Sequence, residues 1–153
     1  MIKTIIKILC SVMIYSSTAC ASGSYVSTNG LKIHYQEYGE GEPLLLLHGG
    51  SLTSGSWKSF IPEASKHFHV YALDSRGHGK TNNPDGEISY HQMADDVASF
   101  ISKLKLNKPV VMGYSDGGLT ALLLAMQYPE LPAAIVMGDA THTLGSGERY
   151  FDG

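Results

Sequence analysis

Residues 109–118 read PVVMGYSDGG, and this stretch decides the fold. Its first four residues are apolar, which is typical of a strand buried on both faces. The apolar run 119–126 that follows predicts a helix. Between them stands the pattern Gly-x-Ser-x-Gly, in which Gly113 and Gly117 flank Ser115. A serine on a sharp turn from a buried strand into a helix indicates a nucleophile elbow.

The spacing of the two glycines has a steric reason. A serine on so sharp a turn takes a strained backbone, and side chains two residues to either side would collide. The same turn places the Ser115 hydroxyl at a helix N-terminus, where free N–H groups and the helix dipole favour a developing oxyanion. The alternative is a glycine-rich turn with an incidental serine, which the flanking strand and helix argue against.

The rest of the chain alternates buried strands with helices. Two short strands turn at Asn29-Gly30, and Ser89 with Gln92 forms a capping box that predicts the start of a helix. Further strands are expected at 44–47, 69–73 and 133–137, and a further helix at 57–66. Such alternation predicts an α/β fold, with a mostly parallel sheet and helices on both faces. Active sites of such sheets lie beyond the carboxyl ends of the strands.

Three motifs follow one another along the chain: LLLLHGG at 44–50, DSRGHG at 74–79 and GYSDGG at 113–118. In this order and spacing they resemble the α/β-hydrolase superfamily, and the resemblance runs from about residue 24 to the last residue. The resemblance implies the α/β-hydrolase fold and a Ser-acid-His triad with Ser115 as nucleophile. It implies neither a cofactor nor a metal.

The resemblance also implies an oxyanion hole made of backbone N–H groups. One donor would be Asp116, directly after the nucleophile, and the other Gly50, after the His-Gly pair. Because Ser51 follows Gly50, the donor in that loop could also be a neighbouring residue. His48 resembles a structural histidine that braces the loop, and we assign it no catalytic role.

In this superfamily the acid and then the histidine follow the serine along the chain. Asp139, after the strand expected at 133–137, is a candidate acid, although most members place the acid one strand later. His142 comes where the superfamily usually inserts its lid, so we do not expect it to be the base. The sequence therefore predicts that residues 22–153 are the N-terminal part of a hydrolase domain, truncated before the lid and the last strands.

The Ser-Asp-Gly-Gly form of the elbow resembles valacyclovir-hydrolase-like esterases. An acidic side chain at Asp116 could attract substrates that carry an ammonium group. The alternative, which the sequence alone favours, is that the Asp116 side chain caps the following helix.

The predicted function is a serine hydrolase that forms an acyl-enzyme on Ser115. A small-molecule carboxylic ester is the favoured substrate class, ahead of an amide, a lactone or a carbon–carbon bond. The alternative is a catalytically inactive truncated chain, or a non-catalytic binding protein on a hydrolase scaffold.

Residues 1–21 resemble a secretory signal peptide. Lys3 and Lys7 precede a short apolar run, and small residues follow it up to Ala21. We expect cleavage after Ala21 and export to the periplasm or beyond, with a lipoprotein anchored through Cys20 as the alternative. The apolar run is shorter than the roughly 20 residues that a membrane span needs.

The composition of the chain excludes some classes of binding partner. The chain has 153 residues and a net charge of -3 without a basic stripe, so it is a poor candidate for binding nucleic acid. Both cysteines lie in the predicted leader, which leaves the expected domain without a disulfide or a thiolate metal site. His67 and His69 have a spacing that could ligate a metal, but no third ligand obviously joins them.

Gly79-Lys80-Thr81 is similar to the end of a phosphate-binding loop. That motif needs a glycine where Asp74 stands. We therefore interpret 74–79 as a structural turn in which Arg76 pairs locally, and we expect no nucleotide.

Overall fold

The computed structural model describes residues 23–139. The leader expected at 1–21 and His142 lie outside the described residues. Among residues 23–139, no helix has both the length and the apolar character needed to cross a membrane.

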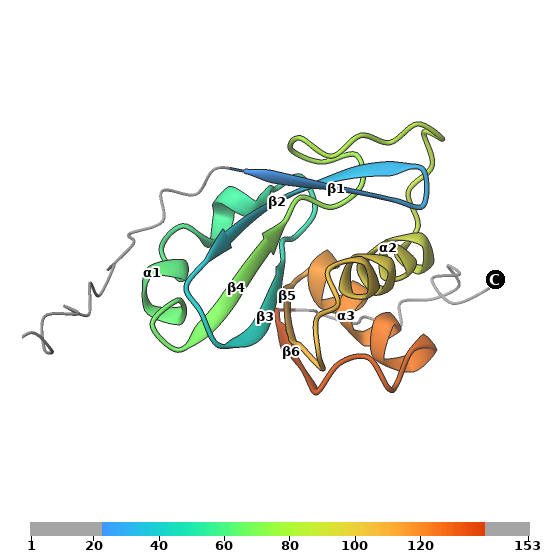
Figure 1. Ribbon diagram of the computed structural model, residues 1–153. Coiled ribbons are helices and arrows are strands. Elements are labelled where there is room, and N and C mark those ends of the chain that lie inside the picture. The colour runs from blue at the N-terminus through green and yellow to red at the C-terminus, as the bar shows by residue number, and fades with distance from the viewer. Residues whose placement is uncertain (1–22, 140–153) are drawn as a thin grey trace, which may run out of the picture.

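A six-stranded sheet forms the centre of the molecule (Figure 1). Its strands are β1 (Ser24–Thr28), β2 (Leu31–Tyr38), β3 (Glu42–Leu47), β4 (Phe68–Leu73), β5 (Val110–Tyr114) and β6 (Ala134–Gly138). They lie in the order β1-β2-β4-β3-β5-β6. The hairpin β1–β2 joins β4 in antiparallel fashion, whereas β4, β3, β5 and β6 run parallel. The carboxyl ends of β3, β4, β5 and β6 therefore meet at one edge, as the sequence predicted.

Helices cover both faces of this sheet. The helices are η1 (Ser54–Trp57), α1 (Ile61–Ala64), α2 (Tyr90–Lys103) and α3 (Asp116–Gln127). Figure 1 shows α2 and α3 together on one side of the sheet and α1 on the other. The predicted α/β-hydrolase arrangement of a mostly parallel sheet with helices on both faces is confirmed.

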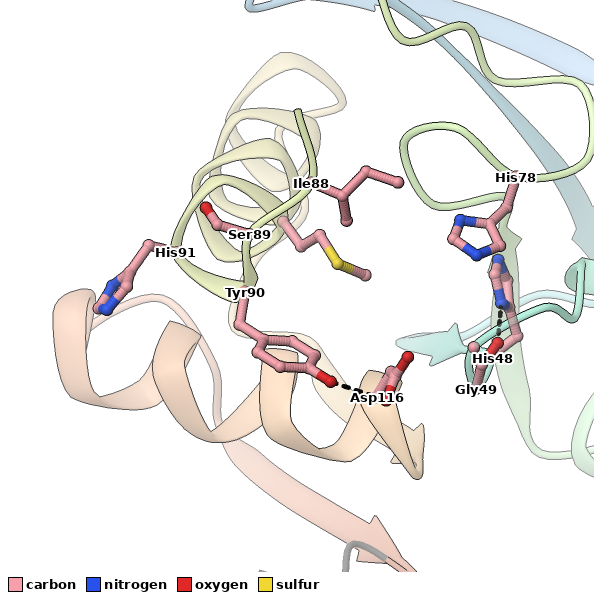
Figure 2. A pocket seen from close by; sticks show the side chains of 10 residues that line it. His48, Gly49, His78, Ile88, Ser89, Tyr90, His91 and Asp116 are labelled. Carbon is pink, nitrogen blue, oxygen red and sulfur yellow. Dashed lines mark hydrogen bonds between the residues drawn. The ribbon is translucent and has the colours of Figure 1, made fainter. Parts of the chain in front are cut away.

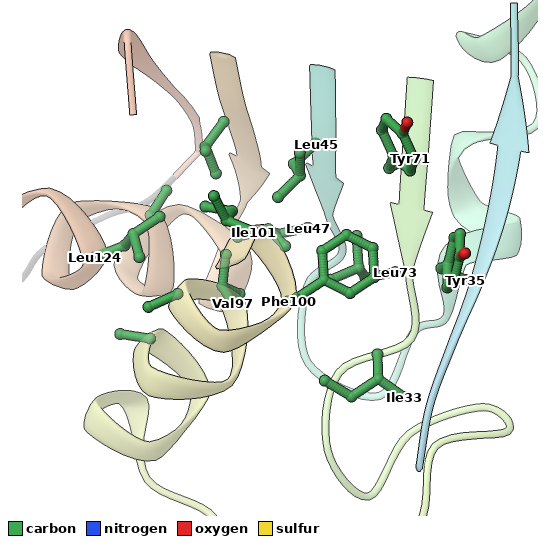
Figure 3. Close-up of a cluster of buried hydrophobic side chains, with 14 of the residues drawn as sticks. Ile33, Tyr35, Leu45, Leu47, Tyr71, Leu73, Val97, Phe100, Ile101 and Leu124 are labelled. Atoms are coloured by element: carbon green, nitrogen blue, oxygen red, sulfur yellow. The ribbon is translucent and has the colours of Figure 1, made fainter. Parts of the chain in front are cut away.

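The continuous apolar run of β3 divides its side chains between two cores. Leu45 and Leu47 pack into the larger cluster with Phe100 and Ile101 of α2 (Figure 3). Leu44 and Leu46 belong to a second cluster that contains Ile61 and Ala64 of α1. Successive side chains of a strand point to opposite faces, so a strand with a helix layer on each side needs apolar residues throughout.

Two local predictions at helix starts need correction. The single helix expected at 57–66 is instead the short turn η1 followed by the four-residue α1. Pro62 has no N–H to donate to a preceding carbonyl, so a helix cannot run through it and begins again at Ile61. At α2, Ser89 accepts from the Gln92 N–H at 3.2 Å, but the Gln92 side chain bonds the Ser89 hydroxyl rather than its backbone.

The loop 74–79 after β4 is the structural turn that its sequence indicated. Asp74 is buried and accepts hydrogen bonds from the backbone N–H groups of Ser54 at 2.7 Å and Lys80 at 3.0 Å. His34 Nδ1 lies 2.8 Å from the same carboxylate. These contacts fix the loop at the sheet edge where the elbow also lies.

Local pairing of Arg76 was expected, and this expectation is wrong. Arg76 reaches α2, where its Nε donates to Asp96 Oδ2 at 2.8 Å and its Nη2 to Asp96 Oδ1 at 3.1 Å. Both side chains are buried. Closer along the chain, Arg76 Nη1 makes only a long contact of 3.9 Å with Oδ2 of Asp85. The ion pair thus joins the loop after β4 to the helix that carries the pocket wall.

His67 and His69 do not share a ligand sphere. His69 Nε2 lies 2.7 Å from a carboxylate oxygen of Glu37, while His67 is exposed beside Glu63 at 3.9 Å. In the described part of the chain, no three acidic, histidine or cysteine side chains gather in a way that could hold a metal.

Candidate active site

Ser115 stands between β5 and α3 in a strained conformation. Its φ is 51° and its ψ is -115°, a region that residues other than glycine rarely adopt. The strain turns the chain from strand to helix within one residue, so the hydroxyl leaves the sheet edge at the N-terminus of α3. This is the geometry that the sequence pattern predicted for a nucleophile elbow.

The two glycines of the motif are required by backbone contacts. A Cβ at Gly113 would overlap the carbonyl oxygen of Gly117, and a Cβ at Gly117 would overlap the carbonyl oxygen of Leu47. Each glycine therefore lets one segment of main chain lie against another. The elbow is packed onto the end of β3 as well as onto its own strand.

Hydrogen bonds at the main chain hold the elbow in place. The Ser115 N–H donates to the carbonyl oxygen of Gly138 at 2.9 Å, which ties the nucleophile's backbone to the end of β6. The Ser115 carbonyl oxygen in turn accepts from the Gly118 N–H at 2.8 Å. The position of Ser115 is thus set by β5, β6 and α3 together.

The loop after β3 lies directly against the elbow. A Cβ built on Gly49 would stand 3.3 Å from Cβ of Ser115, and one on Gly50 would overlap Oδ2 of Asp116. The structure therefore brings together Ser115 and both predicted oxyanion donors, Gly50 and Asp116. Asp116 is the first residue of α3, and the first N–H groups of a helix have no partner inside it.

His48 braces this loop, in the role that the resemblance implied. Its Nδ1 lies 2.8 Å from the carbonyl oxygen of Gly49, and its Nε2 accepts from the Ser75 N–H at 3.0 Å. The side chain is fully buried. Burial lowers the pKa of His48, and the neighbouring imidazole of His78 lowers it further. Because the Ser75 N–H can only donate, Nε2 accepts, which requires a neutral ring.

A pocket of about 420 Å³ opens beside the elbow (Figure 2). One wall is the loop after β3 together with His78, and the opposite wall is the start of α2 (Figure 2). Ile88 and Met93 give the pocket apolar surface, while Asp116 adds a carboxylate at its floor. A partly apolar cavity with a few convergent polar groups is typical of a small-molecule site.

The Asp116 side chain faces this pocket and does not cap α3, so the favoured expectation from sequence was wrong. The N-cap position is Ser115, and it makes no side-chain capping bond. Oδ1 of Asp116 instead accepts a 2.8 Å hydrogen bond from the hydroxyl of Tyr90 (Figure 2). The pairing draws the carboxylate across the helix N-terminus toward α2.

Asp139, the candidate triad acid, lies one residue beyond the carbonyl that anchors Ser115. It is exposed, and its φ is 45°. Its Oδ2 accepts from the hydroxyl of Tyr114 at 3.3 Å. Within residues 23–139 no imidazole hydrogen-bonds to Asp139 or to the Ser115 hydroxyl. His142 lies outside the described residues.

Sequence reasoning missed the residues that close the pocket. Tyr90, His78, Ile88 and Met93, which line the pocket, received no role in the sequence analysis. The sequence does contain a feature that could have pointed to Tyr90. Ser89 marks the start of a helix that comes after a strand, and Tyr90 is the first residue of that helix. Helices that begin at that edge place their first turn near the active site of an α/β sheet.

Comparisons with known proteins agree with this geometry. The family model for the α/β hydrolase fold matches residues 42–150. The chain is 35% identical over 121 residues to 2-hydroxy-6-oxo-6-(2'-aminophenyl)hexa-2,4-dienoic acid hydrolase of Metapseudomonas resinovorans, covering 76% of this chain and 42% of that protein. It is 33% identical over 136 residues to the human serine hydrolase BPHL, covering 84% of this chain and 46% of the relative.

Solved structures show the same likeness. Est816, an N-acyl homoserine lactone degrading enzyme, is 35% identical and superposes with a TM-score of 0.68, covering 74% of this chain and 44% of that one. The chain thus spans less than half the length of the curated relatives it matches. The residues that the family model matches include the elbow, the loop after β3 and the loop after β4. The chain therefore belongs to the α/β-hydrolase fold family.

Proposed function

We propose that this chain carries the nucleophile of a serine hydrolase that cleaves small-molecule carboxylic esters. The observation that carries the proposal is the strained Ser115 elbow, with the Gly50 loop packed against it and the N-terminus of α3 beneath it. Strained backbone of this kind persists where function requires it. The relatives that the chain resembles are hydrolases by name, which supports the same reaction class.

In the proposed reaction Ser115 Oγ attacks the ester carbonyl carbon, and its proton passes to a base outside the described residues. The carbonyl oxygen takes the negative charge of the tetrahedral intermediate. The N–H groups of Gly50 and Asp116 stabilise that charge, as preorganised donors do in acyl transfer. The base then gives its proton to the alkoxy oxygen, the carbon–oxygen bond of the ester breaks, and the neutral alcohol leaves an acyl group on Ser115. Water then attacks the acyl-enzyme and releases the acid.

The substrate class that the pocket favours is an ester bearing an ammonium group. Asp116 places a carboxylate on the pocket surface next to the nucleophile, where it neither caps a helix nor pairs with a cationic side chain among the described residues. A substrate ammonium within about 4 Å of such a carboxylate gains attraction that a neutral ester does not. No cofactor and no metal take part in this proposal.

The site of action proposed here is outside the cytoplasm, because residues 1–21 have the pattern of an export signal. Anchoring through a lipidated Cys20 is the alternative. Small molecules are the proposed partners, and nucleic acid is not, since the chain is acidic.

Labelling with a fluorophosphonate probe tests the function directly. The folded chain should gain one phosphonyl group, which peptide mass spectrometry should locate at Ser115. Ser115→Ala should abolish labelling, while Ser102→Ala, which changes an exposed serine on α2, should label like the wild type. A folded wild-type chain that does not react would support the alternative, a catalytically inactive truncated chain or a non-catalytic binding protein on a hydrolase scaffold.

A further inference from the structure

His78 occupies the pocket wall opposite α2, and both of its ring nitrogens are engaged. Nδ1 lies 2.9 Å from the carbonyl oxygen of Arg76, and the Ser51 N–H points to Nε2 at 3.4 Å. Its ring lies 5.2 Å from that of His48, centroid to centroid (Figure 2). His78 is therefore one of the contacts between the loop after β4 and the loop after β3.

The chemistry of the partners decides the protonation of His78. A carbonyl oxygen can only accept, so Nδ1 must carry a hydrogen. An amide N–H can only donate, so Nε2 must offer a lone pair. Both contacts exist together only in the neutral ring with its proton on Nδ1. The same logic applies to His48, between the Gly49 carbonyl and the Ser75 N–H.

The two imidazoles hold opposite ends of one turn. Leu52 N–H bonds back to the Gly49 carbonyl at 3.2 Å, which closes a turn over Gly49–Leu52. Ser51, inside this turn, has a φ of 57°, a conformation that costs energy for a residue with a side chain. His48 contacts the Gly49 carbonyl and His78 the Ser51 N–H. Gly50, the proposed oxyanion donor, lies between these two contacts.

We propose that His78 is a positioning residue that holds the Gly49–Leu52 turn, and with it the Gly50 N–H, and that it does so only as the neutral Nδ1–H imidazole. The proposal rests on the proposed function for the role of Gly50, but the contact itself exists without catalysis. Protonation of His78 puts a hydrogen on Nε2, facing the Ser51 N–H. The Ser51 contact then becomes repulsive and the turn is released.

The groups around His78 act in different directions on its charge. His48 stands nearest, is kept neutral by burial, and adds no positive charge while it remains so. Asp74 and Asp116 are the nearby carboxylates, and both act on the pKa of the neighbouring His48 in the raising direction. The Ser51 N–H faces Nε2 of His78 and fits only a ring without a hydrogen there. Across the pocket the start of α2 presents further titratable side chains, namely Tyr90 and His91. The geometry therefore predicts that a proton on Nε2 of His78 breaks the contact with the Ser51 N–H.

Three variants of the whole chain separate this role from a packing role. His78→Gln keeps an acceptor oxygen for the Ser51 N–H and cannot titrate in this range, whereas His78→Phe keeps a ring and removes the acceptor. His67→Gln changes an exposed histidine far from the turn and serves as the matched control. At pH 8 the rate of fluorophosphonate labelling should fall about tenfold or more in His78→Phe, since small displacements of a catalytic group are costly. His78→Gln and His67→Gln should label within about threefold of the wild type, because each keeps the turn's hydrogen bonds.

Labelling across pH 5–8 should show one acid-side loss in the wild type that His78→Gln lacks. Equal profiles for the two proteins, or equal rates for His78→Gln and His78→Phe, would overturn the proposal.

Nitrogen-15 NMR of the wild-type imidazoles gives a readout independent of labelling. At pH 8 His78 should show a protonated Nδ1 and an unprotonated Nε2, and the Gly50 and Ser51 amide signals should shift as His78 titrates. A proton on Nε2 at pH 8, or amide signals that ignore the titration, would overturn the proposal. If the wild type never labels, the proposed function fails, and the NMR result alone decides the role of His78.

Discussion

The hydroxyl of Tyr90 donates a 2.8 Å hydrogen bond to Oδ1 of Asp116, so the first residue of α2 holds the first residue of α3. The other carboxylate oxygen, Oδ2, lies where a Cβ of residue 50 would stand if Gly50 had a side chain. Asp116 is thus held by Tyr90 on one side and lies close to Gly50 on the other. Its charge has a defined place on the pocket wall, beside the proposed nucleophile and one proposed oxyanion donor.

A first prediction concerns substrate preference. Asp116→Asn should lower kcat/KM for amino-acid esters about tenfold relative to neutral esters of equal size, because a partly exposed charge pair at about 4 Å is worth roughly 1–2 kcal/mol. The measurement is a paired hydrolysis series with both ester types. Glu130→Gln, which removes an exposed charge away from the pocket, is the control and should leave the ratio unchanged. An unchanged ratio in Asp116→Asn would remove the ammonium substrate from the proposal.

A second prediction is that Tyr90 contributes to the preference for amino-acid esters by orienting Asp116. Tyr90→Phe keeps the ring and removes the hydroxyl that orients the carboxylate, so the ester ratio should move in the same direction but by about threefold only, as for loss of one hydrogen bond. The same hydrolysis series measures it. In the double variant with Asp116→Asn, the Tyr90 change should have no further effect. Additive losses in the double variant would show that Tyr90 acts by another route.

The sequence could predict the elbow because all its requirements are local. Gly113 and Gly117 lie within four residues of each other, and the strand and helix that flank Ser115 are visible as apolar runs. The partner of Asp116 could not be predicted in this way. Tyr90 is 26 residues away, and the contact depends on how α2 packs against α3. Capping looked favourable for Asp116 because helix propensity ignores such tertiary partners.

The partner of Arg76 could not be predicted for the same reason. Its pairing with Asp96 spans 20 residues and is fixed by where α2 lies over the sheet. The mistake at 57–66 has a different origin, since Pro62 was present in the sequence and its missing N–H forbids a continuous helix there. That break was predictable from local chemistry, whereas the Arg76–Asp96 pair and the His78–Ser51 contact required the fold.

A third prediction tests the steric basis of the elbow. Gly117→Ala should destabilise the fold by about 3 kcal/mol, because its Cβ would overlap the backbone oxygen of Leu47 and main chain cannot move aside cheaply. Gly138→Ala is the matched control, since its Cβ would meet nothing closer than 3.7 Å. Urea denaturation followed by circular dichroism measures both. Similar midpoints for the two variants would contradict the close approach seen at Gly117.

A fourth prediction concerns the buried ion pair between Arg76 and Asp96. Asp96→Asn should cost about 3–5 kcal/mol, because it leaves the guanidinium buried without its countercharge. Replacing both partners with apolar residues, as in Arg76→Met with Asp96→Leu, should recover much of that loss. Urea unfolding of Arg76→Met, of Asp96→Leu and of the double variant gives the coupling. A double variant as unstable as the sum of the single ones would show that the pair acts through separate contacts.

The last prediction follows from the carboxylate of Asp74. Burial by itself would raise its pKa, but hydrogen bonds from the Lys80 and Ser54 backbone N–H groups outweigh burial and hold the pKa below the ordinary value of 3.8. The folded state therefore binds this proton less readily than the unfolded state. The stability that Asp74 contributes is present above about pH 4 and is lost as pH falls through its folded-state pKa.

Asp74→Asn should consequently destabilise the protein at pH 7 by about 2–3 kcal/mol, the usual worth of hydrogen bonds to a charged acceptor. The difference from the wild type should shrink below pH 4, because protonation there removes the same charge from Asp74. Urea unfolding at intervals from pH 7 to pH 2.5 measures the difference at each step. Asp85→Asn, at a largely exposed carboxylate, should stay within about 0.5 kcal/mol of the wild type throughout. A constant deficit of Asp74→Asn down to pH 2.5 would mean that shape rather than charge at position 74 holds the loop.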